Sequence, residues 1–97
     1  MAVRCVFKSA FVKAFDKLVP PKQLLVTKAL EALQSYFKSG QASYGLRIKK
    51  LYKGNKGKVL EARVSIDLRI VWVQTSEEIV FALVGSHDEV RRFLKNL

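Results

Sequence analysis

Two arginines, Arg63 and Arg69, stand on successive segments with the alternating pattern of strands. A three-residue loop from Ser65 to Asp67 would bring apolar side chains together on one face of this hairpin. The apolar pairs are then Val64–Leu68, Ala62–Ile70 and Leu60–Trp72. The same register places Arg63 beside Arg69, and Glu61 beside Val71, on the opposite face, and a one-residue slip would mix the two sets.

Two arginines directly opposite each other repel by about 0.2–1 kcal/mol. An anion bound between them would remove that repulsion. The alternative is that both side chains extend into solvent and that Glu61 or Asp67 neutralises one of them. The pairing alone leaves both interpretations open.

Basic residues precede the hairpin and add to the positive charge around the arginine pair. They are Arg47, Lys49, Lys50, Lys53, Lys56 and Lys58. Such a run often forms only a solvated loop. Because it adjoins the arginine pair, it also fits a continuous surface for phosphate groups.

His87 is the only histidine, and it follows an apolar strand in the segment Ser86-His87-Asp88-Glu89. Ser-x-x-Glu is the pattern of a capping box, which predicts a helix beginning here. The first turn of a helix attracts phosphate through its free N–H groups and its dipole. A single histidine can also have no function, so its presence alone indicates nothing. Its position at the start of a helix is what favours a role in phosphate binding or catalysis.

The rest of the chain supplies the elements that must position these groups. Val3, Cys5 and Phe7 predict a short first strand in which Cys5 is a small core residue. Helices are predicted over 10–18, with Ser9 as N-cap, and from Pro20-Pro21 to about 38, with Gly40 as the stop. The expected buried stripe of the second helix is Leu25, Ala29, Ala32, Leu33, Tyr36 and Phe37.

Strands follow over 46–52, 59–64, 68–74 and 79–84, and a turn is expected at Gly54-Asn55-Lys56-Gly57. A short last helix should turn Val90, Phe93 and Leu94 inward. We therefore expect an α+β fold in one domain over 1–97, with a helical hairpin packed on one face of a small, mainly antiparallel sheet. The other face would remain available for function.

Composition limits the classes of function. The formal net charge is +10 and there is a single cysteine. That charge favours a polyanion, with nucleic acid ahead of a membrane surface or an acidic protein. No internal disulfide can form, and we expect a cytoplasmic protein without a membrane segment. One histidine, one cysteine and scattered carboxylates show no metal-ligand spacing, so no metal or other cofactor is expected.

The segments Glu61 to Trp72 and Val84 to Val90, preceded by Leu46 to Leu51, resemble the RelE/ParE toxin superfamily and look most like its RelE branch. The resemblance extends over nearly the whole chain and depends on the order and spacing of the segments. It implies a metal-independent endoribonuclease that cleaves mRNA, often on the ribosome, and is neutralised by an antitoxin protein. In such enzymes the 2′-hydroxyl of the RNA attacks the adjacent phosphate.

The resemblance also implies roles for residues. Arg69 and Arg63 would stabilise the phosphorane, and His87 would be the general acid. Lys49 and Lys50 would hold the RNA backbone, with Arg47, Lys53 and Asp88 completing the expected RNA-binding set. Glu61 could be the general base or a salt-bridge partner, and Asp88 could orient His87 or serve the helix's acidic first turn.

The sequence departs from the best-known pattern of this branch at two places. Leu60 and Ala62 stand where one branch has lysines, and Arg91 and Phe93 occupy the region of a C-terminal tyrosine. Two alternative functions therefore stay open. One is a ParE-like inhibitor of DNA gyrase with no chemistry of its own, and the other is a catalytically inactive RNA-binding protein of the same fold.

Overall fold

The computed structural model describes residues 4–41, 45–54 and 57–96. Three residues of the predicted elements lie outside these ranges: Val3 of the first strand, and Asn55 and Lys56 of the turn at 54–57. The elements are β1 (Arg4–Phe7), α1 (Ser9–Asp16), α2 (Pro20–Ser39), β2 (Lys49–Lys53), β3 (Lys58–Ser65), β4 (Leu68–Gln74), β5 (Glu78–Gly85) and α3 (His87–Lys95). This is the expected α+β order.

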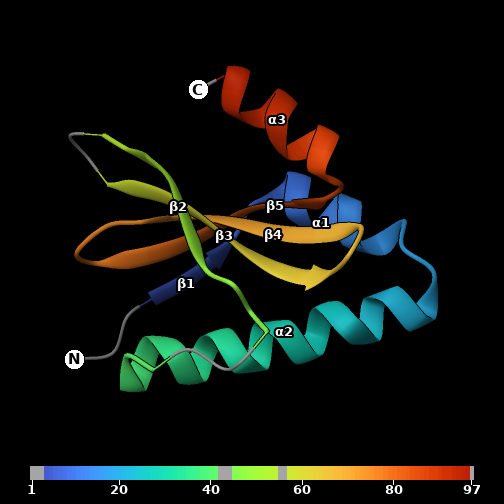
Figure 1. Cartoon of the computed structure of the whole chain (residues 1–97), viewed down its shortest axis with the longest axis horizontal. Coiled ribbons are helices and arrows are strands. Elements are labelled where there is room, and N and C mark those ends of the chain that lie inside the picture. Colours follow the sequence, from blue (N-terminus) through green and yellow to red (C-terminus); the bar gives the residue numbers. More distant parts are fainter. Residues whose placement is uncertain (1–3, 42–44, 55–56, 97) are drawn as a thin grey trace.

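The five strands form one sheet in the order β1-β5-β4-β3-β2 (Figure 1). The sheet is antiparallel except that β1 runs parallel to β5. The chain between β1 and β2 contains α1 and α2, and this crossover carries it from one edge of the sheet to the other. A parallel β1–β5 pair is possible here because β1 and β5 are not consecutive in the chain and no tight hairpin joins them.

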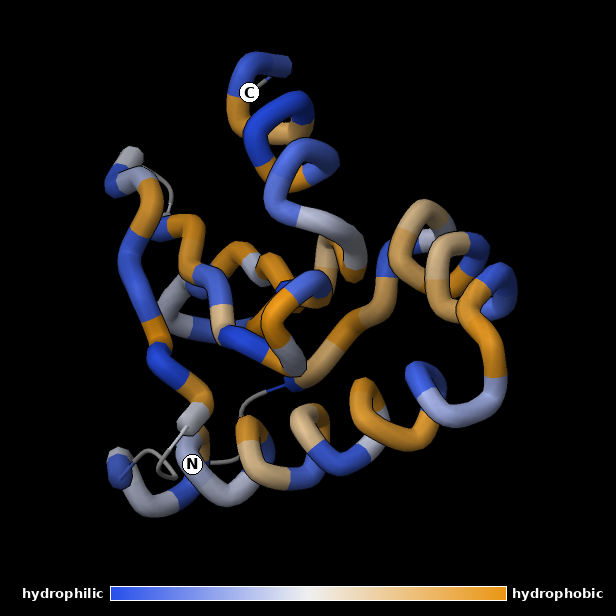
Figure 2. The backbone as a smooth tube through the Cα atoms, turned by 45° about the vertical axis from the view of Figure 1, so that its right-hand side comes forward, coloured by the Kyte–Doolittle hydropathy of each residue, from blue (hydrophilic) through white to orange (hydrophobic). Residues whose placement is uncertain are grey.

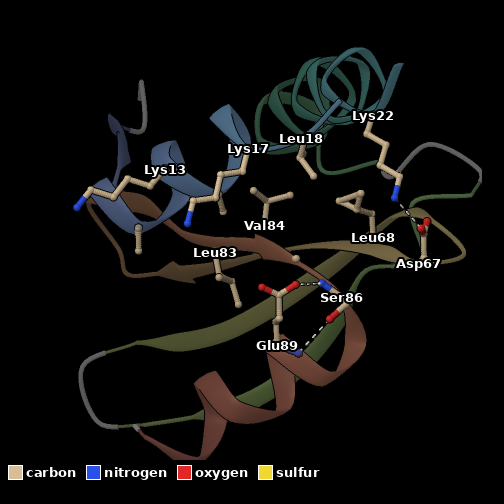
Figure 3. A pocket seen from close by; sticks show the side chains of 13 residues that line it. Lys13, Lys17, Leu18, Lys22, Asp67, Leu68, Leu83, Val84, Ser86 and Glu89 are labelled. Carbon is tan, nitrogen blue, oxygen red and sulfur yellow. Dashed lines mark hydrogen bonds and ion pairs between the residues drawn. The ribbon is translucent and has the colours of Figure 1, made fainter. Parts of the chain in front are cut away.

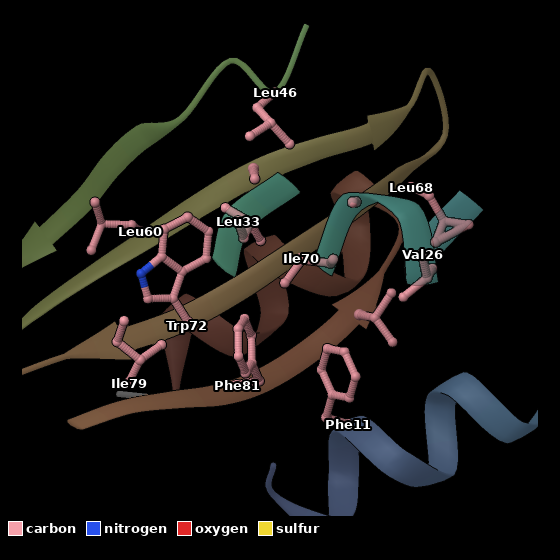
Figure 4. Close-up of a cluster of buried hydrophobic side chains, with 13 residues drawn as sticks. Phe11, Val26, Leu33, Leu46, Leu60, Leu68, Ile70, Trp72, Ile79 and Phe81 are labelled. Carbon is pink, nitrogen blue, oxygen red and sulfur yellow. The ribbon is translucent and has the colours of Figure 1, made fainter. Parts of the chain in front are cut away.

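Helices α1 and α2 cover one face of the sheet and enclose the main core (Figure 4). Trp72, Ile70 and Phe81 from β4 and β5 are fully buried there. The α2 residues in this core are Val26, Ala29 and Leu33. The expectation for Leu25 is wrong, because its side chain is 42% exposed while Val26 is 0% exposed. The predicted Ala29, Ala32, Leu33 and Phe37 do pack in or against this core, so the stripe is confirmed except that it begins at Val26 instead of Leu25.

Helix α3 lies on the opposite face of the sheet, as Figure 1 shows. Its Val90 joins Val59 and Val71 in a second buried cluster, with Phe93 and Leu94 packed against it. The inward direction of these α3 residues is therefore confirmed. The face that was expected to remain available for function is therefore partly occupied by α3, and it also carries Arg63 and Arg69. Hydrophilic residues are frequent in β2 and α3, whereas hydrophobic residues are frequent in the strands between the helices (Figure 2).

Helix ends agree with the sequence signals except at α1. Gly40 is the left-handed C-cap of α2, with φ of 78°. Ser9 is the first residue of α1 and Lys8 is its N-cap, without a side-chain cap. Both reciprocal hydrogen bonds of the Ser86–Glu89 capping box form, at 2.9 and 3.2 Å.

Cys5 is exposed, which corrects its assignment to the core. Its Cα partner is the core residue Ile79, but β1 is the edge strand of the sheet, so its side chain is not enclosed on every side. Within the described residues, none of the helices is long and apolar enough to span a bilayer.

Candidate nucleic-acid interface

Arg63 and Arg69 are direct cross-strand partners on β3 and β4. The sequence-derived pairs Leu60–Trp72, Ala62–Ile70 and Glu61–Val71 are also confirmed. The loop differs from the prediction, because a β-bulge after Arg63 makes Ser65, not Val64, the partner of Leu68. The connection is thus a two-residue turn at Ile66 and Asp67. The bulge lies beyond the arginine pair and leaves its register intact.

The arginine pair continues across a third strand. The β5 partner of Arg69 is Gly85, so Arg63, Arg69 and Gly85 form one row over three adjacent strands. Two strand spacings make this row about 10 Å wide. Gly85 is buried and has no side chain, so the row consists of two guanidinium groups beside a backbone position that Glu89 covers. We call these three residues the arginine row.

Glu61 is buried, at 8% exposure, on the face that carries the arginines. Its Oε2 lies 3.8 Å from Nη1 of Arg69, and the two side chains are only 11% and 21% exposed. Nε of Arg69 is buried and has no hydrogen-bond partner among the described residues. One arginine of the pair is thus partly neutralised by a carboxylate, while its guanidinium keeps an unused donor.

His87 is the first residue of α3, two positions after Gly85, and its side chain is exposed. Helix α3 packs against Val71 and Val59, which lie on the face that carries Arg63 and Arg69. The helix carrying His87 therefore lies over the arginine face and begins at the end of the row. Asp88 is exposed in the same first turn.

Gly85 is required by the start of α3. A Cβ at this position would lie 2.9 Å from Oε1 of Glu89, closer than real Cβ contacts allow. Glu89 is also the residue that closes the capping box. The sequence showed the cap, but nothing in it showed that the capping carboxylate lies over the end of the arginine row.

Arg47 lies near the arginine row because Leu46, which precedes it, is hydrogen-bonded to Arg63. The N–H of Arg63 donates to the carbonyl of Leu46 at 2.6 Å, and Leu46 is buried. Arg47 itself is exposed and has a left-handed backbone with φ of 46°. This conformation costs a non-glycine residue about 1–2 kcal/mol. The tie between Leu46 and Arg63 fixes Arg47 beside β3.

The lysines of β2 divide between the two faces of the sheet. Lys49 pairs with Glu61 and therefore shares the arginine face. Lys50 pairs with Leu60, and Lys53 with Lys58, so both lie on the face of α1 and α2. The structure thus brings Lys49 and Arg47 near the arginine row and places Lys50 and Lys53 elsewhere.

A groove of about 510 Å³ lies between α1, α2 and the start of α3 (Figure 3). Lys13, Lys17 and Lys22 line it, and none of them was a sequence candidate. Asp67 and Glu89 also line it, and Asp67 binds Lys22 at 3.0 Å. These carboxylates offset two of the three positive charges.

No group of three or more potential metal-ligating side chains occurs in the part of the chain that the structure describes. The groups gathered at the arginine row are cations and one carboxylate. Such a set suits an anion of the phosphate class, which guanidinium groups bind strongly.

Comparison with solved structures shows which fold carries this row. The RelE component of an archaeal RelE–RelB complex from Pyrococcus horikoshii OT3 superposes with a TM-score of 0.69 at 16% identity, over 89% of this chain and 96% of that chain. This chain has the RelE-like toxin fold. A chain of the DinJ–YafQ complex from E. coli gives a TM-score of 0.68 at 16% identity, over 92% and 98% of the two chains.

A further RelE-like structure, the YoeB dimer from Staphylococcus aureus, gives a TM-score of 0.65 at 20% identity, over 90% of this chain and 99% of that chain. No protein-family model matches the sequence, and no curated protein matches it. The similarity therefore lies in the RelE-like fold rather than in the residues. The activity has to be argued from this chain's own side chains.

Proposed function

We propose that this protein is a metal-independent endoribonuclease toxin that cleaves mRNA on the ribosome in the cytoplasm and is neutralised by an antitoxin. The observation that carries the proposal is the direct pairing of Arg63 with Arg69 on a partly open sheet face. A phosphate between two guanidinium groups turns their repulsion into two charge-assisted contacts. The toxin and antitoxin parts of the proposal are supported by the RelE-like fold and by relatives solved with RelB and DinJ.

The proposed reaction is attack of a ribose 2′-oxygen on the adjacent phosphorus. The 2′-hydroxyl loses its proton to a base, the bond from phosphorus to the 5′-oxygen breaks, and that oxygen gains a proton. The products are a 2′,3′-cyclic phosphate and a 5′-hydroxyl. The phosphorane gathers extra negative charge, which Arg63 and Arg69 would stabilise.

His87 is assigned as the acid for the leaving oxygen. This role is supported by its exposure and by its position as the first residue of α3, two residues after Gly85 of the arginine row. Arg47, Lys49, Lys50, Lys53 and Asp88 remain the proposed RNA contacts, with Arg47 and Lys49 nearest the row.

Glu61 is better suited to holding Arg69 than to accepting the proton of a 2′-hydroxyl. It is buried, and its carboxylate already faces a guanidinium. Because its Oε2 is directed at Nη1 of Arg69 and only 11% of its side chain is exposed, it has little access to a ribose hydroxyl. We therefore assign Glu61 as a positioning residue for Arg69.

The proposed antitoxin partner is supported by charge and by exposed apolar surface. The net charge is +10, and an apolar groove of about 200 Å³ lies between β1, α1 and α2. Phe7 and Val12 line it and are 42% and 45% exposed. An acidic protein segment with apolar side chains would suit both features.

The test uses purified protein with mRNA, in the presence and absence of ribosomes. Cleavage should leave a cyclic phosphate and should stop when the attacking ribose is replaced by 2′-deoxyribose. Arg69→Ala should reduce the cleavage rate by roughly 10²–10³-fold, as expected for loss of one charge-stabilising group. His87→Ala should also reduce it, while Arg92→Ala, an exposed change on α3, should not.

Intact RNA together with inhibited supercoiling by gyrase would replace this proposal with the ParE-like alternative. RNA binding without cleavage under all these conditions would replace it with the inactive alternative.

A further inference from the structure

The end of the sheet opposite the arginine row carries a second group of cations. Lys53 and Lys58 are direct partners on β2 and β3, and Gln74 of β4 is the next partner of Lys58. Lys53, Lys58 and Gln74 thus form another row across three strands, which we call the lysine row. Lys58 lies five residues from Arg63 along β3, a separation of about 17 Å.

The lysine row borders a hollow of about 450 Å³ at the tip of the sheet. Gly54, next to β2, and Gly57, next to β3, border it on one side, and the β4–β5 turn borders it on the other (the β4–β5 turn is at the left in Figure 1). Gly57 is the contact between these two sides, since a Cβ at this position would lie 2.7 Å from the carbonyl oxygen of Gln74. Thr75 and Ser76 of the β4–β5 turn also line the hollow.

The charges at this tip are not balanced locally. Lys53 and Lys58 are exposed and oppose each other directly, which costs about 0.2–1 kcal/mol. Within the described residues, neither has a carboxylate at ion-pair distance. The nearby Glu78 is bound to Arg4 at 2.7 Å, and Glu77 acts with it to raise the pKa of Arg4.

We propose that the lysine row is a second phosphate-binding site, formed by Lys53, Lys58, Gln74 and Ser76. Two ammonium groups, an amide and a hydroxyl are donors that a phosphate accepts. The lysine-lined groove of Figure 3 is a poorer candidate, because Asp67 and Glu89 offset much of its charge.

The ligand at the lysine row is a phosphate of an RNA chain that extends beyond the arginine row. This identity of the ligand rests on the proposed RNA-directed function, whereas the site itself rests on the lysine pair and the hollow. The rows lie on opposite faces, so the RNA would pass around β2, the edge strand that also carries Lys49 and Lys50.

The protein contains its own reporter for this site. Nε1 of Trp72 donates to Oε1 of Gln74 at 3.3 Å, and Trp72 is the only tryptophan. Its single indole N–H resonance should therefore shift when phosphate contacts Gln74. Titration with inorganic phosphate and with a 2′-O-methyl RNA oligonucleotide, which cannot be cleaved by 2′-attack, separates the free ion from the chain.

The decisive variant is Lys53→Gln/Lys58→Gln, with Lys28→Gln/Lys38→Gln on α2 as a control that removes the same charge. Log affinity for the oligonucleotide falls with log salt concentration by about 0.7 per phosphate contact. Loss of the one phosphate contact at this site should therefore make the slope shallower by about 0.7 in the first variant, compared with the control, and the RNA-induced indole shift should disappear. A shift with inorganic phosphate but not with RNA would refute the RNA chain as the ligand.

Equal slopes in the two variants, with an indole resonance that moves for neither ligand, would refute the site. The binding measurement does not depend on cleavage. A wild-type protein that cleaves no RNA but shows the expected slopes would refute the nuclease proposal alone. Cleavage by a protein whose lysine row has no effect on binding would refute this inference alone.

Discussion

Nη1 of Arg69 lies 3.8 Å from Oε2 of Glu61 on the neighbouring strand, while Nε of the same arginine is buried without a hydrogen-bond partner among the described residues. A buried donor that is left unpaired is costly, by about 1–3 kcal/mol. An anion bound between the two guanidinium groups would relieve the repulsion between Arg69 and Arg63. The contact with Glu61 thus leaves part of the donor capacity of Arg69 unsatisfied, which supports the phosphate site that we propose at the arginine row.

Replacement of Glu61 by glutamine distinguishes a positioning residue from a general base. Loss of a base typically lowers the rate by about 10²–10⁴-fold and removes the acidic limb of the pH–rate profile. We expect Glu61→Gln to lower kcat by less than this and to keep the shape of the profile. The measurement is the RNA cleavage rate from pH 5 to 9, and disappearance of the acidic limb would make Glu61 the base.

The two arginines should differ in their effect on stability. Arg63→Gln removes one member of a like-charge pair and should stabilise the fold by about 0.2–1 kcal/mol at low salt. Arg69→Gln leaves Glu61 buried without its cation and should destabilise by about 1–3 kcal/mol. Urea unfolding in low and high salt measures both changes. Similar effects of the two substitutions would contradict the asymmetry of the pair.

Gly85→Ala should disturb the start of α3. The added Cβ would lie 2.9 Å from Oε1 and 3.2 Å from Cβ of Glu89, so the capping carboxylate must move. Loss of a cap costs about 1 kcal/mol, and displacement of the helix start would also move His87. The melting temperature and the RNA cleavage rate should therefore both decrease. Ser86→Ala is the control, because it removes the cap without adding bulk, and an equal loss of activity there would remove the special role of Gly85.

The Lys22–Asp67 ion pair joins α2 to the β3–β4 turn and should make stability depend on pH. Hydrogen bonds from Ser65 and Lys22 hold the pKa of Asp67 below its usual 3.8. The charged form is thus favoured by folding, so its contribution is present above pH 3.8 and is lost as pH falls through the lowered value. Asp67→Asn should be less stable than wild type at pH 7, and the difference should close in strong acid. A gap in urea midpoint that stays constant down to pH 2 would contradict this.

The β3–β4 register could be predicted because one face of this hairpin is apolar. Leu60, Ala62, Ile70 and Trp72 fit together only in the register that also pairs Arg63 with Arg69. The loop was predicted one residue too long because a bulge after Arg63 leaves no periodic signal in the sequence. The helix start at Ser86 was visible because capping is a local interaction between residues three apart.

Contacts between distant segments could not be derived in this way. The sequence predicted an inward Cys5, but the edge position of β1 exposes it. It also gave no sign that α3 would cover part of the arginine face. The separation of Lys49 and Lys50 onto opposite faces, by contrast, follows from their being neighbours in one strand.

By itself, the sequence determined the alternation of the strands, the Gly40 and Ser86 caps and the arginine pair, because each depends on neighbours a few residues apart or on one apolar face. Tertiary structure decided which strands stand at the edges, where α3 lies and what surrounds Arg69. Those outcomes depend on long-range packing, in which a whole sheet must bury its apolar surface at once, and no local pattern encodes that choice.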